Sequence, residues 1–262
     1  MKLTEREIEL NGKKYQYLDT DLGEEAIVFV HGLGSNKDIM PKIFNSFLKD
    51  YRCIFLDLPG HNKLPNYNFE KLEDFADYII NFVEGTHLTK FSLVGFSYGG
   101  LISVVTQKKL KEKGINVKAV AWASPMRKDF LTLKSKIFLK IVDKFENKKF
   151  RKLPGNIYFR FVVALLGIKV TDDELNSFKY FDNNLLDKFH KLMPDHFINT
   201  DGQEILYIYG SKDPLINEQA MKKTILHGEN QFKFKITKGG HYMTKIGKRL
   251  AHEKIREFLK SN

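Results

Sequence analysis

A run of five residues without a polar side chain, Ala26–Val30 (AIVFV), most restricts how this chain can fold. A strand that is apolar on both faces must be covered on both faces, which is typical of a parallel sheet between helices. An Asn11-Gly12 turn joins two strands expected at residues 5–10 and 14–20 into an antiparallel hairpin. Further strands are expected at residues 51–56, 91–95, 117–123, 204–209 and 232–236, with helical periodicity after most of them. The pattern predicts an α/β protein with a mostly parallel sheet of eight strands.

Residues 126–200 interrupt this alternation. Apolar residues from Phe130 to Phe145 recur at helical spacing, residues 157–168 and 184–193 have the pattern of further helices, and no buried strand is evident. The segment therefore predicts a helical cap inserted between the sixth and seventh strands. Residues 1–125 and 201–262 would then form the core domain, against which we expect most apolar cap side chains to pack.

The positive charge of the chain is unevenly distributed. The chain has 43 Lys and Arg against 32 Asp and Glu, a net charge of +11. Residues 1–126 are neutral, with 16 side chains of each sign, whereas residues 127–152 hold ten cations and three anions. Only 7 of the 43 cations are Arg, the residue that nucleic-acid readers favour, so we expect no nucleic-acid partner. The cations of residues 127–152, which include the first helix expected in the cap, could face solvent, substrate or, in a weak contact, an anionic membrane surface.

Nothing in the sequence predicts export or membrane insertion. The first ten residues alternate charged and apolar side chains, unlike the apolar stretch of a signal peptide. The longest nearly apolar run, residues 157–168, contains Arg160 and is shorter than the roughly 20 residues that a spanning helix needs. The single cysteine, Cys53, excludes an internal disulfide. We therefore expect a cytoplasmic protein.

The segment Gly95-Phe96-Ser97-Tyr98-Gly99-Gly100 carries the clearest chemical signal. It joins a short apolar strand to a helix, the context in which G-x-S-x-G exposes a serine hydroxyl on a tight turn. Such a turn needs small residues two positions either side of the serine, because other backbone lies within contact distance. It also directs the amino end of the helix, with its free N–H groups, at developing negative charge.

With this motif, the sequence resembles the α/β-hydrolase fold proteins that carry a helical cap. The resemblance covers essentially the whole chain. The other supporting motifs follow expected strands: His31-Gly32-Leu33-Gly34, Asp57-Leu58-Pro59-Gly60-His61, Gly210-Ser211-Lys212-Asp213-Pro214 and Gly240-His241. The resemblance implies the α/β-hydrolase fold, an eight-stranded, mostly parallel sheet flanked by helices.

The resemblance also implies a catalytic triad in the order Ser, Asp, His. Ser97 would be the nucleophile, His241 the base and Asp213 the acid that orients the imidazole. Asp129, after the sixth expected strand, is a competing acid, although the surroundings of Asp213 match the common pattern better. His31 and His61 match family positions that are usually structural, and we leave them out of the triad.

By the same resemblance, the backbone N–H groups of Leu33 and Tyr98 would form the oxyanion hole. Epoxide hydrolases and haloalkane dehalogenases of this fold use an aspartate nucleophile, so the serine argues against both. The sequence shows no metal-binding cluster and no phosphate-binding glycine loop, and we expect neither metal nor cofactor.

These features predict a serine hydrolase with carboxylesterase-like or lipase-like activity. The substrate would be a small-molecule ester with a small to medium hydrophobic acyl group, cleaved through an acyl-enzyme at Ser97. A thioesterase would use the same acyl-enzyme. Two alternatives remain: hydrolysis of a carbon–carbon bond in a keto-acid, and a non-catalytic ligand-binding protein on the same fold.

Overall fold

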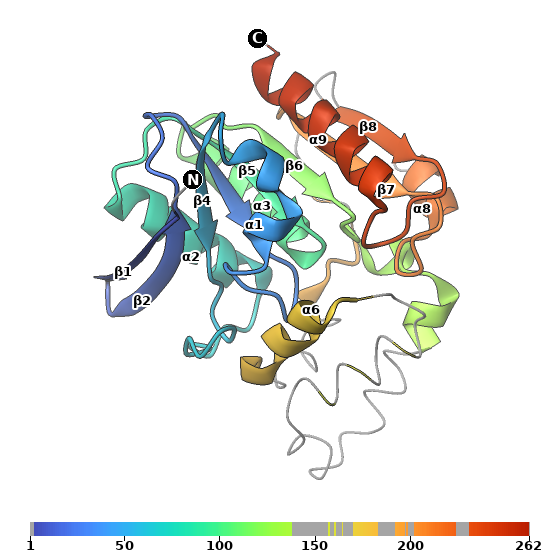
Figure 1. Ribbon diagram of the computed structural model, residues 1–262, viewed down its shortest axis with the longest axis horizontal. Coiled ribbons are helices and arrows are strands. Elements are labelled where there is room, and N and C mark those ends of the chain that lie inside the picture. Colours follow the sequence, from blue (N-terminus) through green and yellow to red (C-terminus); the bar gives the residue numbers. More distant parts are fainter. Residues whose placement is uncertain are drawn as a thin grey trace.

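A computed structural model describes residues 3–137, 170–182, 192–196, 202–223 and 231–261, together with residues 157, 160, 164 and 198. Within these residues, eight strands form one sheet in the order β1-β2-β4-β3-β5-β6-β7-β8 (Figure 1). Their bounds are β1 Thr4–Leu10, β2 Lys13–Asp19, β3 Ala26–Val30, β4 Arg52–Leu56, β5 Phe91–Phe96, β6 Ala119–Trp122, β7 Ile205–Gly210 and β8 Gln231–Ile236. The predicted sheet is confirmed, with strand ends within two residues of those expected.

The sheet is antiparallel only at its amino-terminal side. Leu10 pairs with Lys13 across the predicted turn, so β1 and β2 form a hairpin. β2 is also antiparallel to β4, and every later pairing is parallel. The chain places β4 between β2 and β3, an order that the sequence pattern does not encode.

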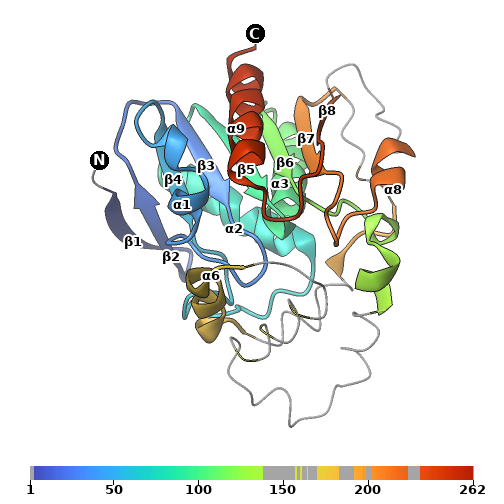
Figure 2. The same cartoon turned by 45° about the vertical axis from the view of Figure 1, so that its right-hand side comes forward.

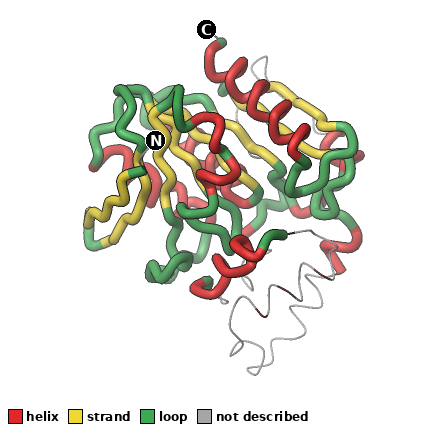
Figure 3. Tube along the Cα trace, in the orientation of Figure 1, coloured by secondary structure: helices red, strands yellow, loops and turns green. Residues whose placement is uncertain are grey.

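Helices cover both faces of this sheet (Figures 1 and 2). On one face α2 (Leu72–Gly85) and α3 (Tyr98–Glu112) pack side by side, and α3 also contacts β3, β5 and β6. On the other, α1 (Met40–Ile43) and the following short helix η1 (Asn45–Phe47) pack near α9 (Lys245–Lys260). A shorter helix, α8 (Glu218–Lys223), precedes β8. Strands and helices alternate along most of the described chain, as a parallel sheet with crossover helices requires, and Figure 3 shows the helices packed around the strands.

After β3, apolar residues from Ile39 to Leu48 recur at the spacing of a single helix, but the structure divides this stretch into α1 and η1. The backbone leaves the helical region at Phe44, where φ is −106° and ψ is 25°. The Phe44 ring lies 4.5 Å from the Phe29 ring and 5.3 Å from the Trp122 ring. The spacing of the apolar residues by itself favours one continuous amphipathic helix. Packing of the Phe44 ring against the sheet favours a break at that residue instead.

The parallel strands bring four distant loops to one edge of the sheet. β3, β5, β7 and β8 end at Val30, Phe96, Gly210 and Ile236. Because the carboxyl ends of parallel strands share an edge, the loops after these strands lie together. All five predicted site residues belong to these loops or to the first residue of α3.

Only part of the segment between β6 and β7 is described. It includes η2 (Lys128–Phe130), α6 (Asp172–Ser177) and η4 (Phe178–Tyr180). The helix expected from Phe130 is described only as far as Ile137, and the predicted helices at 157–168 and 184–193 lie largely outside the described residues. The division into core and cap therefore stays a prediction, as does the location of the cations beyond residue 137.

The described beginning of this segment agrees with the sequence pattern only in part, because Phe130 is buried as expected but the next two apolar positions of the pattern are not. Leu133 and Ile137 expose 74% and 49% of their surface, although we expected them to pack on the core. The side of this helical turn that faces the core carries Ser135 instead. The hydroxyls of Thr132 and Ser135 both donate hydrogen bonds to the carbonyl of Pro214, which holds this side against the core. In the part of the chain that the structure describes, no helix is both long and apolar enough to cross a membrane.

Candidate active site

Ser97 lies on the turn between β5 and α3, as the G-x-S-x-G pattern predicts. Its φ of 54° and ψ of −124° lie in a region that residues other than glycine rarely adopt. Such a conformation costs about 1–3 kcal/mol and is kept only where the surroundings enforce it. Here the Ser97 N–H donates to the carbonyl of Trp122 at 2.8 Å, and the Ser97 carbonyl accepts from the Gly100 N–H at 3.0 Å.

The turn needs its two flanking glycines because backbone occupies the space beside them. A Cβ atom on Gly95 would lie 2.2 Å from the carbonyl oxygen of Gly99. One on Gly99 would lie 2.1 Å from the carbonyl oxygen of Val30. The glycines let strand, turn and helix approach closely enough to present the Ser97 side chain at the sheet edge.

The structure brings the three residues of the predicted triad together. His241 Nε2 lies 3.1 Å from Ser97 Oγ, and His241 Nδ1 lies 2.9 Å from Asp213 Oδ2. A carboxylate can only accept, so Nδ1 carries the proton and Nε2 is left to accept one from the serine hydroxyl. The His241 residue is 5% exposed and the Asp213 side chain is fully buried, which keeps water from competing for the carboxylate.

Local hydrogen bonds hold Asp213 in this orientation. Its Oδ1 atom accepts from the Leu215 N–H at 2.8 Å, so both carboxylate oxygens are engaged. The preceding residue, Lys212, donates its N–H to the Gly239 carbonyl at 2.8 Å. This bond links the loop that carries Asp213 to the loop that carries His241.

The two predicted oxyanion donors flank Ser97. Tyr98 is the first residue of α3, where helix geometry leaves N–H groups without intrahelical acceptors. Leu33 follows Gly32, and a Cβ on Gly32 would be 3.0 Å from Ser97 Cβ, so this loop lies directly against the serine. Among the described residues, no hydrogen bond from the Leu33 N–H is found.

Two buried histidines lie beside this loop and are held by backbone groups. His31 Nε2 accepts from the Leu58 N–H at 3.0 Å, so its Nδ1–H donates to the Gly32 carbonyl at 2.8 Å. His61 accepts from the Gly34 N–H at 2.9 Å and donates to the Pro59 carbonyl at 3.0 Å. Burial lowers the pKa of His61 to about 4 and lowers that of His31 as well. Both rings are therefore neutral at pH 7, and both ring nitrogens of each are already engaged.

The competing acid, Asp129, is bound elsewhere. Its carboxylate accepts two hydrogen bonds from the Arg127 guanidinium, which lowers the pKa of Asp129. The side chain is half exposed. The acid that contacts His241 is Asp213, in agreement with the closer sequence match.

Aromatic rings surround the imidazole of His241. The ring centroids of Phe96 and Tyr242 lie 5.4 Å and 5.6 Å from that of His241. Burial raises the pKa of the Tyr242 hydroxyl, and the nearby Glu174 carboxylate on α6 raises it further. The imidazole of His241 thus packs against two aromatic rings.

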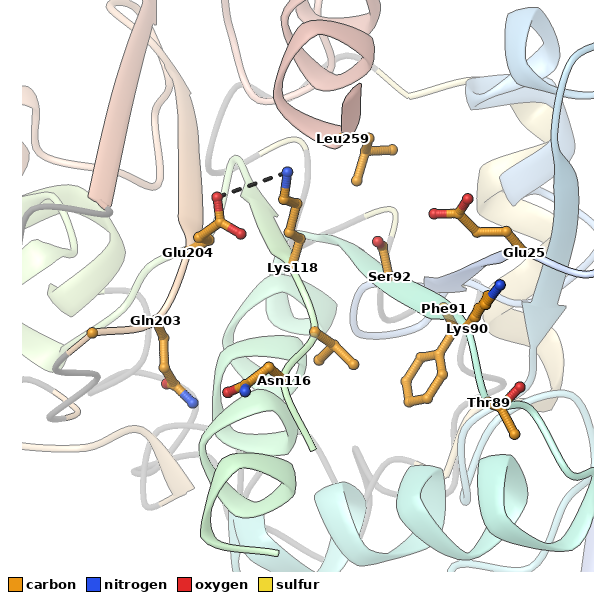
Figure 4. A pocket seen from close by; sticks show the side chains of 12 residues that line it. Glu25, Thr89, Lys90, Phe91, Ser92, Asn116, Lys118, Gln203, Glu204 and Leu259 are labelled. Carbon is orange, nitrogen blue, oxygen red and sulfur yellow. Dashed lines mark ion pairs between the residues drawn. The ribbon is translucent and has the colours of Figure 1, made fainter. Parts of the chain in front are cut away.

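A hollow at the opposite edge of the sheet is unrelated to this constellation. It is lined by residues at the amino ends of the strands, including Lys90, Ser92, Lys118 and Glu204 (Figure 4). Lys118 is occupied there, because its ammonium donates to the carbonyls of Phe258 and Ser261 and lies 3.7 Å from Glu204. No three His, Cys, Asp or Glu side chains in the described ranges are placed to hold a metal ion.

Comparison with known proteins places the chain in a family. Residues 25–245 match the model of the alpha/beta hydrolase fold family, so the protein belongs to that family. Among curated proteins, it is 24% identical over 245 residues to "Putative esterase/lipase 2" of Mycoplasma pneumoniae, covering 88% of each chain.

Solved structures agree on the fold. An epoxide hydrolase of Bacillus megaterium superposes with a TM-score of 0.78 at 17% identity, over 98% of this chain and 100% of the other. A carboxylesterase of Bacillus subtilis superposes with a TM-score of 0.77 at 14% identity, over 100% and 93%. At these identities the likeness establishes the fold and leaves the reaction to be argued from the site.

The sequence did not reveal one group of residues that the structure places at the site. Ser177 and Phe178, between β6 and β7, contact the loop that carries Leu33. The only local signal in their neighbourhood is the helix-start pattern Thr171-x-x-Glu174, which says nothing about the loop it approaches.

Proposed function

We propose that this protein is a serine hydrolase that cleaves esters of small to medium hydrophobic acyl groups through an acyl-enzyme at Ser97. The observation that carries the proposal is the continuous chain of contacts from Ser97 Oγ through the His241 imidazole to the Asp213 carboxylate, at 3.1 and 2.9 Å. A serine hydroxyl is a weak nucleophile at neutral pH and needs a base within hydrogen-bond reach, which this arrangement provides.

The first half-reaction forms the acyl-enzyme. His241 Nε2 takes the hydroxyl proton as Ser97 Oγ attacks the ester carbonyl carbon, and the carbonyl oxygen becomes an oxyanion. The N–H groups of Leu33 and Tyr98 donate to this oxyanion, each worth about 3 kcal/mol in the transition state. His241 then returns the proton to the alkoxide, the alcohol leaves, and the acyl group stays on Ser97.

The second half-reaction repeats the steps with water. His241 takes a proton from the water, which attacks the acyl carbon, and then protonates Ser97 Oγ as the carboxylic acid leaves. The Asp213 carboxylate holds the imidazole in place and stabilises the imidazolium that forms in both halves.

The choice of substrate rests on the surroundings of the triad and on the relatives. Tyr242 beside His241 is only partly buried and offers an aromatic surface to a hydrophobic acyl group. A curated relative that matches along most of the chain is named "Putative esterase/lipase 2". The chain superposes on an epoxide hydrolase, but epoxide hydrolases of this fold are expected to use an aspartate nucleophile. A serine, Ser97, occupies the turn here.

The test compares Ser97→Ala with Ser92→Ala, which removes a hydroxyl from the other end of the same strand. We expect Ser97→Ala to lower kcat on nitrophenyl acetate, butyrate and octanoate by about 10³-fold or more and to abolish labelling by a fluorophosphonate probe. Ser92→Ala should leave both within about twofold. Unchanged turnover in Ser97→Ala would overturn the proposal.

Two further assays separate the alternatives. Activity on a diketo-acid chromophore, with none on the esters, would favour carbon–carbon bond hydrolysis. Failure of the probe to label Ser97 in the wild-type protein, with no hydrolysis of any ester, would favour a non-catalytic ligand-binding protein.

A further inference from the structure

A short segment between β6 and β7 rests on the loop that carries the Leu33 N–H. The segment comprises α6 and η4, and in Figures 1 and 2 α6 lies next to the end of the sheet below α1. The Ser177 hydroxyl lies within hydrogen-bond distance of two carbonyls, that of Gly34 at 2.8 Å and that of Glu174 at 2.7 Å, so its single proton is shared between a partner on the loop and one on α6. Ser177 and Phe178 are 8% and 4% exposed, so this contact is sheltered from water.

The Phe178 ring occupies the space that a side chain at Gly34 would need. A Cβ atom on Gly34 would lie 1.7 Å from Phe178 Cε1, and the φ of Gly34 is +74°. Glycine is therefore required here both for its left-handed backbone and for the approach of the ring. Gly34 is held from two sides, since its N–H donates to His61 and its carbonyl accepts from Ser177.

The position of Gly34 determines the direction of the Leu33 N–H through a tight turn. The Ser35 N–H donates to the Gly32 carbonyl at 3.1 Å, which closes the turn Gly32–Ser35 around Gly34. The same carbonyl accepts from His31 Nδ1 at 2.8 Å. The Gly32 carbonyl and the Leu33 N–H belong to one trans peptide and point in opposite directions. Fixing the carbonyl therefore fixes the N–H.

Further contacts anchor the segment to the core on either side of Ser177. The Thr171 side chain accepts from the Glu174 N–H, and the Glu174 carboxylate accepts from the Thr171 N–H at 2.6 Å, which closes the amino end of α6. The ammonium of Lys42, on α1, lies 2.5 Å from the Asp173 carboxylate. Beyond η4, the Asp182 N–H donates to the carbonyl of Gly60 at 2.8 Å. The bond from Asp182 to Gly60 joins the carboxyl end of the segment to the core, whereas the ion pair at its amino end is exposed and contributes little.

We infer that Ser177 and Phe178 are positioning residues that hold the Gly32–Ser35 turn so that the Leu33 N–H points at the developing oxyanion. The inference rests on the proposed serine-hydrolase function and adds to it a role for a segment outside the triad loops. Neither side chain takes part in proton transfer or bond formation. Their effect is on the transition state, because the oxyanion exists only after attack.

The experiment compares Ser177→Ala with Thr86→Val. Thr86 also donates its hydroxyl to a backbone carbonyl, that of Phe82, but it lies near the amino end of β5. Each protein is titrated with the fluorophosphonate probe, so that kcat is expressed per reactive Ser97. We expect Ser177→Ala to lower this kcat about tenfold with KM changed less than twofold, because a small misplacement of a transition-state donor is costly.

A second readout reports the oxyanion directly. A trifluoromethyl ketone adds to the serine and places its oxyanion in the same hole, so its affinity should fall about tenfold in Ser177→Ala. Phe178→Leu should lower kcat in the same way, to a smaller extent. Thr86→Val should match the wild type in both measurements.

The outcomes distinguish the two proposals. If the wild type is labelled and active while Ser177→Ala and Phe178→Leu keep full kcat per site, the positioning role is wrong and the proposed function stands. If the variants merely contain fewer reactive sites, with unchanged kcat per site, the segment supports stability alone and the inference is overturned. If the wild type is neither labelled nor active, the proposed function itself fails.

Discussion

Two histidine–aspartate pairs lie at the same edge of the sheet and differ in what their ring nitrogens contact. In the first, His241 bonds to the Asp213 carboxylate at 2.9 Å and leaves Nε2 facing Ser97. In the second, His31 Nε2 lies 3.8 Å from Asp57 Oδ1 and accepts a backbone N–H instead. All four side chains are buried. Burial and residue type are therefore the same in both pairs, and only the contacted groups differ.

The contrast shows what makes a buried histidine available for chemistry. His241 has one nitrogen bound to an acid and the other facing a hydroxyl that can give up its proton. Both nitrogens of His31 are bound to backbone groups that cannot exchange protons usefully at neutral pH. The Asp57 carboxylate accepts from the Lys37 N–H and from the Asn62 amide, and burial raises its pKa to about 7. The second pair thus holds the loop that carries Leu33 and the loop after β4 together.

The largest expected effect on kcat comes from replacing the aspartate of the first pair by asparagine, and the same substitution in the second pair serves as the comparison. Asp213→Asn should lower kcat about 10³- to 10⁴-fold, because an amide N–H would face His241 Nδ1 and favour the wrong tautomer. Asp57→Asn is the matched control and should change kcat per reactive site less than about fivefold. Steady-state ester hydrolysis with active-site titration measures both. Equal losses of kcat in the two variants would show that the two pairs have the same role.

The next effect is on stability rather than turnover. His31→Ala removes the partner of the Leu58 N–H and one of the two partners of the Gly32 carbonyl, and it leaves a cavity, so we expect the free energy of unfolding to fall by about 3 kcal/mol. His196→Ala, at an exposed histidine, should change it by less than about 0.5 kcal/mol. Urea unfolding followed by circular dichroism measures the difference. A His31→Ala protein as stable as the wild type would show that these hydrogen bonds contribute little.

The buried histidines also predict how stability depends on pH. The pKa of His61 is lowered to about 4 in the folded protein, whereas the unfolded chain takes up the proton near pH 6.5. Between these values the unfolded state binds more protons, so the free energy of unfolding falls as the pH is lowered from about 6.5 to 4. One such histidine contributes a slope of up to about 1.4 kcal/mol per pH unit.

The variant His61→Gln isolates this contribution. The high pKa of Asp57 acts in the opposite direction, but Asp57 is present in both proteins and its effect largely cancels in the comparison. We expect the wild type to lose stability more steeply than His61→Gln between pH 6.5 and 4, and the two slopes to agree above pH 7. Urea titrations across this range test it. Parallel curves throughout would contradict the lowered pKa.

The smallest effect is expected at the acid that the structure separates from the triad. Asp129→Asn removes a half-exposed ion pair with Arg127, which contributes no more than about 1 kcal/mol. Because His241 is already oriented by Asp213, kcat should stay within about twofold of the wild type. A loss comparable with that of Asp213→Asn in the same ester assay would restore Asp129 as the orienting acid.

Much of the fold could be predicted from the sequence, because local patterns encode it. The unbroken apolar run Ala26–Val30 is a fully buried strand, and Asn11-Gly12 forms the predicted hairpin turn. Ser97, Asp213 and His241 each lie just after the end of a strand, in segments rich in glycine. The resemblance to the α/β-hydrolase fold family names these three residues, and parallel strands bring their carboxyl ends to one edge of the sheet.

Other features were decided only by the tertiary structure. No local signal places β4 between β2 and β3, distinguishes the contacts of His31 from those of His241, or predicts that Phe44 divides a helix. The bond from Ser177 to Gly34 joins residues 143 positions apart. Hydrogen-bond partners so distant in the chain have no periodicity to reveal them. The sequence by itself therefore determined the sheet and the candidates for the reaction, and the tertiary structure decided which groups hold those candidates in place.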